Sequence, residues 1–140
     1  MPAYDECYLD SMIKKHRYLF KLIGRYCENN AFTVIKTYLC CDYRKRMDEG
    51  NPLYLNKTPK QILGEMGIRV ELVSEISDRY DEFILEWMAD IYTYMQWKYG
   101  ISSRLISDKI KPDDLYTKYY PLHEASLENA VDKLVKIYDL

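Results

Sequence analysis

Two long segments with apolar residues at helical spacing constrain this chain more than any other feature of its sequence. Within residues 9–28 and 78–98, apolar side chains recur every three or four positions, which places them on one face of an α-helix. Each helix must bury this face against another element, so the two are expected to share one hydrophobic core. The first stripe comprises Leu9, Met12, Ile13, His16, Leu19, Phe20, Ile23 and Cys27, and the second comprises Tyr80, Phe83, Ile84, Trp87, Met88, Ile91, Tyr94 and Met95.

A second pattern occurs twice, at residues 51–66 and 119–134. Each copy has a Pro-Leu pair, a short link, a hydroxyl residue suited to helix capping, and then apolar residues at helical spacing. Thr58 is followed three residues later by Gln61, which predicts a capping box, and Ser126 is expected to cap the last helix.

The recurrence indicates an internal duplication. The predicted copies span 9–67 and 78–138 within a single domain of residues 1–140. We therefore predict an all-α bundle of about six helices, arranged as two tandem three-helix units.

Two segments leave the choice between helix and strand open. Residues 31–43 are rich in β-branched side chains, which favour a strand, but their neighbours are helical and we expect a helix. Residues 68–76 begin with alternating apolar and polar side chains, and a short strand near 68–72 is the expected exception to the all-α class.

The composition is that of a globular protein. Apolar residues make up 48% of the 140 positions, enough for a core without disulfides or metal ions. No apolar run is long enough to span a membrane, and the first residues do not resemble a secretion signal, so we expect a cytoplasmic protein. The four cysteines lack the paired spacing of a zinc site, so we expect free thiols, no metal and no cofactor.

Charge is distributed unevenly along the chain. Residues 1–70 carry a net charge of +4 and residues 71–140 carry −6. The first predicted helix has a basic face opposite its apolar stripe, and a second basic run follows near residue 45. Opposite charges on the two halves would also suit pairing between halves or between protomers. The residues proposed to contact a partner are Lys14, Arg17, Lys21, Arg25, Arg44, Lys45, Arg46 and His123.

The C-terminal half resembles a known family of small helical bacterial domains of unknown function. The pattern Tyr-x-x-Leu-His, a hydroxyl residue and a Val-Asp-x-Leu helix carries the resemblance, which covers roughly residues 80–138. The first half resembles a diverged copy, with Tyr54 where the histidine would be. Members occur mainly in Gram-positive gut bacteria, often encoded near proteins similar to ADP-ribosyltransferases. The resemblance implies a helical, non-enzymatic accessory role. The matching residues are Tyr119, Leu122, His123, Ser126, Val131, Asp132 and Leu134.

No catalytic motif is recognisable. His123 precedes a predicted helix cap and is expected to bond the backbone at that corner, and His16 is expected to be a satisfied core histidine. We therefore expect no enzyme. The predicted function is a protein-binding accessory or inhibitor module, of an antitoxin or phage anti-defence type, that acts by covering a surface of its partner. The alternative is a nucleic-acid-binding regulator that uses the basic face of the first helix. Self-association into a homo-oligomer is compatible with either function.

Overall fold

The computed structural model describes residues 2–26, 30–67 and 80–140, and these residues fold into helices without a strand. The first half contains a 3-10 turn (Glu6–Tyr8), α1 (Leu9–Tyr26), α2 (Ala31–Leu39), α3 (Asp42–Asp48), α4 (Pro52–Leu55) and α5 (Pro59–Glu65). The second half contains α6 (Glu82–Tyr99), α7 (Ser103–Lys109), α8 (Pro112–Thr117), α9 (Tyr119–Leu122) and α10 (Leu127–Ile137). The all-α prediction is confirmed.

The described helices are shorter and more numerous than the sequence suggested. Residues 31–43 are helical, as expected, but the helix stops at Cys40 and restarts after Cys41, whose thiol accepts a hydrogen bond from the backbone N–H of Arg44. The predicted caps at Thr58 and Ser126 are both present, and the Thr58 cap is a complete capping box with Gln61. The strand expected at 68–72 lies outside the described residues.

The same order of helices occurs in both halves. After the 3-10 turn of the first half, each half has a helix of 18 residues, two shorter helices, a four-residue helix and a final helix capped by a hydroxyl side chain. This is the order that a duplicated unit would give, although the duplication itself stays a prediction.

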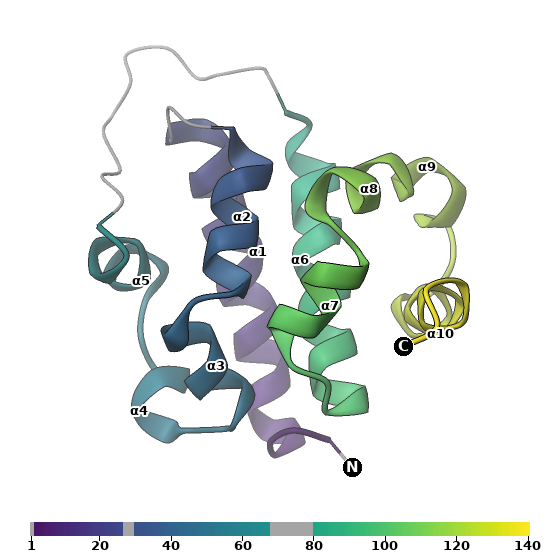
Figure 1. Cartoon of the computed structure of the whole chain (residues 1–140). Coiled ribbons are helices and arrows are strands. Elements are labelled where there is room, and N and C mark those ends of the chain that lie inside the picture. Colours follow the sequence, from purple (N-terminus) through teal and green to yellow (C-terminus); the bar gives the residue numbers. More distant parts are fainter. Residues whose placement is uncertain (1, 27–29, 68–79) are drawn as a thin grey trace.

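The two long helices, α1 and α6, lie side by side and antiparallel at the centre of the molecule (Figure 1). Their apolar stripes form much of the core, as expected: Leu19, Phe20 and Ile91 have no exposed surface. The helices approach closely at Gly24, where an added Cβ would lie 2.4 Å from Cδ1 of Leu85. A glycine at this position therefore lets the α1 backbone pack directly against a core leucine of α6.

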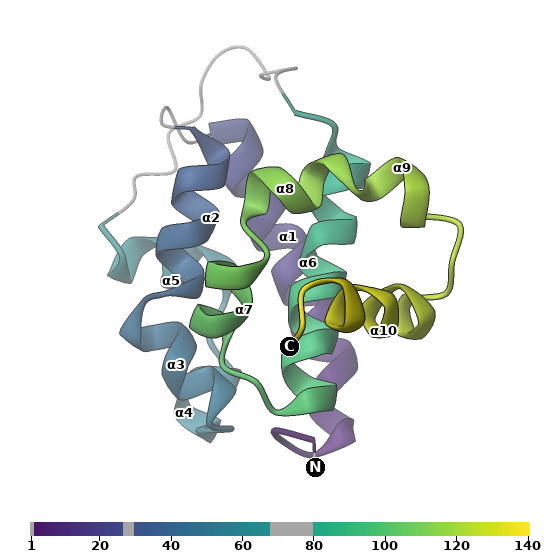
Figure 2. The ribbon, with the colours of Figure 1, turned by 45° about the vertical axis from the view of Figure 1, so that its right-hand side comes forward.

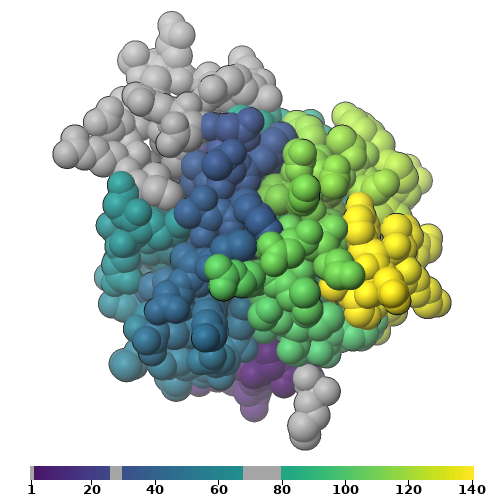
Figure 3. Space-filling view, in the orientation of Figure 1, coloured from purple at the N-terminus to yellow at the C-terminus, as the bar shows by residue number. Residues whose placement is uncertain are grey.

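The shorter helices surround this central pair. α5 packs on α1 and α10 packs on α6, at opposite sides of the bundle (Figure 1). α2, α3, α7 and α8 cover one face of the pair, where α2 contacts α7 and α8, and α3 contacts α7 (Figure 2). The space-filling view shows these helices forming one continuous surface (Figure 3). The two halves therefore share a core, as a single domain requires.

None of the described helices is both long and apolar enough to cross a lipid bilayer.

Candidate partner-binding surface

Four basic residues of α1 were predicted to contact a partner, and three of them form ion pairs with α6. The guanidinium of Arg17 binds the Asp90 carboxylate through two hydrogen bonds of 2.5 and 2.8 Å. Lys21 Nζ lies 2.7 Å from Glu86, and Arg25 makes a bidentate contact with Glu82. Both sets of side chains recur every four residues, so they face each other in order along the antiparallel pair. The expected pairing of opposite charges between the two halves is confirmed here.

These ion pairs leave little charge on α1 for an external partner. The fourth basic residue, Lys14, pairs with Asp10 one helical turn away at 2.9 Å, and both side chains are largely exposed. The basic face is thus neutralised within the chain along its whole length. The sequence could not reveal this, because periodicity does not show which helix lies next to which face.

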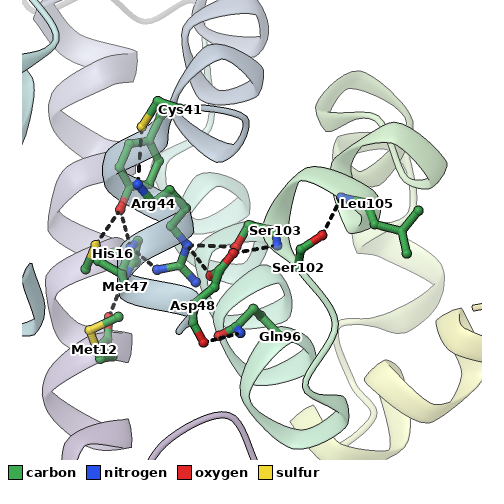
Figure 4. A network of polar contacts seen from close by, with 11 residues as sticks. Met12, His16, Cys41, Arg44, Met47, Asp48, Gln96, Ser102, Ser103 and Leu105 are labelled. Carbon is green, nitrogen blue, oxygen red and sulfur yellow. Dashed lines mark hydrogen bonds and ion pairs between the residues drawn. The ribbon is translucent and has the colours of Figure 1, made fainter. Parts of the chain in front are cut away.

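Arg44, another nominated residue, is fully buried and forms the centre of a polar network (Figure 4). Its Nε donates to Ser103 Oγ at 2.8 Å and lies 3.1 Å from Asp48 Oδ1. The Asp48 carboxylate also accepts hydrogen bonds of 2.7 Å from the backbone N–H and the hydroxyl of Ser103. Because Ser103 belongs to α7 and the charged pair to α3, this network ties the two halves together.

His16 completes the network from α1. Its Nδ1 lies 2.7 Å from the Met12 carbonyl, which can only accept, so Nδ1 carries the proton. The remaining nitrogen, Nε2, then accepts from Arg44 Nη1 at 2.8 Å. Burial, together with the neighbouring Arg44 charge, lowers the pKa of His16 well below its ordinary value. The expectation of a satisfied core histidine is confirmed, and the buried network has a structural role.

The other two basic residues of α3 lie at the surface. Arg46 stands over the Tyr54 ring, 5.5 Å from its centroid. Lys45 lines a pocket of about 200 Å³ between α3 and α7, together with Cys40, Cys41 and Arg104. This volume is below the roughly 300–1,000 Å³ typical of ligand sites, so the pocket is not a good candidate for a cofactor.

His123, the last nominated residue, belongs to an aromatic cluster on the surface. We use "aromatic surface" for the five side chains Phe83, Trp87, Tyr119, Tyr120 and His123. Phe83 and Tyr120 are 74% and 71% exposed, and Trp87 and Tyr119 are half-buried. The ring centroids of Trp87 and Tyr119 lie 5.5 Å apart in an edge-to-face arrangement, and those of Tyr119 and His123 lie 4.6 Å apart in a stack.

The backbone positions this surface. Phe83 and Trp87 are one turn apart on α6 and therefore point the same way. Tyr119 and Tyr120 open the short helix α9, and Leu122 at its end is buried and anchors it. His123 Nδ1 lies 3.1 and 3.0 Å from the carbonyl oxygens of Tyr119 and Tyr120, so the predicted backbone bonding of this histidine is confirmed.

The two α6 residues of the aromatic surface differ in burial: Trp87 packs against the core, whereas Phe83 is exposed. They occupy the second and sixth positions of their helix, and α1 has Asp10 and Lys14 at the same two positions. In α1 these positions hold a solvated ion pair, while in α6 they hold a phenylalanine and a tryptophan. A long helix of this molecule can therefore have charged side chains there, and the exposed ring of Phe83 calls for another explanation.

Sequence reasoning assigned Phe83 and Trp87 to the core stripe, and for Phe83 this was wrong. On a helical projection both residues lie at one edge of the stripe, away from the fully buried Ile84, Met88 and Ile91. This edge position indicates that the side chain is exposed unless another helix covers it. Nothing in the sequence indicates that Tyr119 of α9 contacts Trp87 while Phe83 stays exposed.

No group of His, Cys, Asp and Glu side chains suited to a metal ion occurs within residues 2–26, 30–67 and 80–140. Comparison of the chain with protein families, characterised proteins and solved structures finds no match.

Proposed function

We propose that this chain is a protein-binding module that contacts its partner through the aromatic surface. The observation that carries the proposal is the ring cluster that joins the half-buried Trp87 and Tyr119 to the exposed Tyr120. The exposed Phe83 lies one helical turn before Trp87 on α6. Exposed apolar side chains that are scattered singly are ordinary, but a contiguous group of large rings is typical of a binding surface. Tryptophan and tyrosine are also among the residues that contribute most to the free energy of protein association.

The ion pairs of the basic residues favour the aromatic surface over the basic face of α1 that was expected from the sequence. Arg17, Lys21 and Arg25 are engaged with carboxylates of α6, so their use by a partner would require breaking contacts within the chain. The same engagement removes the main argument for nucleic-acid binding, which needs cations free to neutralise phosphates. A module of this kind would act by covering a surface of its partner, as an inhibitor or antitoxin does.

The test compares two variants that each place carboxylates on the surface. Phe83→Asp/Tyr120→Asp disrupts the aromatic surface, and Leu53→Asp is the matched control, because Leu53 is 76% exposed on α4. Tagged chains are recovered from the native host and their bound proteins are quantified by mass spectrometry. We expect a protein retained by the wild type and the control but reduced at least about tenfold in the double variant. Equal recovery with all three chains would refute the proposal, provided that their urea midpoints agree.

A further inference from the structure

We infer that the aromatic surface binds a guanidinium group, so that the partner presents an arginine side chain to it. This inference rests on the proposed function and specifies the chemistry of the partner. Three features carry it: a hydrogen-bond acceptor on the exposed His123 side chain, the exposed rings of Phe83 and Tyr120, and two exposed carboxylates that adjoin the aromatic surface in the sequence.

The acceptor follows from the hydrogen bonds of His123. Its Nδ1 faces the carbonyl oxygens of Tyr119 and Tyr120, which can only accept, so Nδ1 must donate. In the neutral ring the other nitrogen, Nε2, then has a lone pair and no proton. The side chain is exposed, so this lone pair is accessible to a donor from another molecule. A partner that supplies an N–H group satisfies it.

The rings favour a cation as the source of that donor. Tyr119 meets Trp87 and Tyr120 edge-on, at interplanar angles of 76° and 74°, and His123 stacks on Tyr119. Tyr120 is 71% exposed and offers a face to solvent. A guanidinium group stacks on such faces and is attracted by their electron density. The chain already contains this interaction elsewhere, with Arg46 over the ring of Tyr54 at 5.5 Å.

Two carboxylates that lie close to the aromatic surface in the sequence would complement a positive charge. Asp81 caps α6 two residues before Phe83, and Glu124 directly follows His123. Both are exposed, and neither forms an ion pair with any residue that the structure describes. A positive charge also adjoins this stretch at Lys118, which precedes Tyr119, but this side chain is half-buried whereas the two carboxylates are exposed. Arginine fits these groups better than lysine, because its planar group presents five donors and stacks on rings at the same time.

The test uses small probes with the purified full-length chain. N-acetyl-arginine methylamide is titrated against the 15N-labelled protein, and the citrulline analogue serves as a neutral probe of nearly the same shape. We expect saturable shifts of the Trp87 indole and of the His123 and Tyr120 amide signals. Binding of the arginine probe should be at least about fivefold tighter than that of the citrulline probe.

A matched variant assigns the effect to the histidine. His123→Phe keeps a ring stacked on Tyr119 but removes the Nε2 acceptor, so the preference for arginine should shrink while the protein stays folded. Equal binding of the two probes, or shifts confined to other parts of the chain, would overturn the inference. Those outcomes leave the proposed function intact if the Phe83→Asp/Tyr120→Asp variant still loses its partner. If the two probes bind equally and the Phe83→Asp/Tyr120→Asp variant recovers as much partner as the wild type, both the inference and the proposed function are refuted.

Discussion

Arg17 and Asp90 occupy the same position, the ninth, of their respective 18-residue helices, and they form an ion pair with each other. Equivalent positions that meet in this way are the hallmark of a two-fold relationship, in which residue i of one unit faces its counterpart in the other. Several other helix contacts follow the same exchange. α2 touches α8 and its counterpart α7 touches α3, while α5 and α10 each pack on their own long helix. The packing is therefore what two copies joined face to face would give.

The first prediction concerns the coupling between these two residues. Reversing one charge, in Arg17→Asp or Asp90→Arg, should destabilise the fold because two like charges then face each other across α1 and α6. The double reversal should recover much of the loss. We expect a coupling free energy of about 1 kcal/mol in a double-mutant cycle measured by urea unfolding. The exposed pair Lys14–Asp10 is the control and should show almost none. Strictly additive effects at 17 and 90 would show that the pair contributes nothing.

The second prediction compares two glycines that lie within helices. At Gly24 a methyl group would collide with Leu85, so Gly24→Ala should destabilise the protein although alanine favours helices. At Gly64, on the exposed side of α5, an added Cβ would meet nothing within 4 Å, and Gly64→Ala should stabilise by up to about 1 kcal/mol. Opposite shifts of the thermal midpoint are expected. A stabilised Gly24→Ala variant would contradict the close packing of α1 on α6.

The sequence predicted the parts of this structure that depend on local chemistry. The caps at Thr58 and Ser126 follow from a hydroxyl group placed before an apolar helix, and such a group finds its partner within one turn. The burial of Leu19 and Phe20 follows in the same way from the periodicity of one helix. These features needed no knowledge of distant residues.

Whether a residue predicted to bind a partner is accessible depends on which helices lie next to each other. The sequence does not show this arrangement. Lys21 looked available because Glu86, its partner, is far away along the chain. Arg44 was expected to be a surface cation, although Ser103 and Asp48 contact its Nε and His16 contacts its Nη1 in the core. Its Nη2 has no hydrogen-bond partner among the described residues. Phe83 was assigned to the buried stripe because the periodicity of α6 does not show which edge positions a neighbouring helix covers.

The third prediction concerns the buried charge at the centre of the polar network. Arg44→Met removes the cation but leaves the Asp48 carboxylate in the core, where its side chain is only 7% exposed. A buried charge that has lost its partner typically costs about 3–5 kcal/mol, and we expect a loss of that size in urea unfolding. Lys45→Met is the matched control, because Lys45 is the exposed neighbour on the same helix and should change stability by less than about 0.5 kcal/mol. A loss below about 1 kcal/mol for Arg44→Met would mean that the network does not hold the halves together.

The fourth prediction is a dependence of stability on pH that originates at His16. Burial and the nearby Arg44 lower the pKa of this imidazole well below 6.5 in the folded state, whereas the unfolded chain has an ordinary histidine. Below about pH 6.5 the unfolded state therefore takes up a proton that the folded state does not. The free energy of unfolding must fall as the pH falls through this region, and the stabilisation is fully present above it. The expected loss between pH 7.5 and pH 5.5 is about 1 kcal/mol.

His16→Gln separates this contribution from that of the carboxyl groups. Burial raises the pKa of Asp48 and of Asp90, so these groups also titrate as the solution is acidified, but both carboxyl groups are present in the variant and in the wild type. Urea midpoints recorded at several pH values should therefore show a steeper decline for the wild type than for His16→Gln. Parallel curves for the wild type and His16→Gln would show that the buried imidazole is protonated as readily in the folded chain as in the unfolded one.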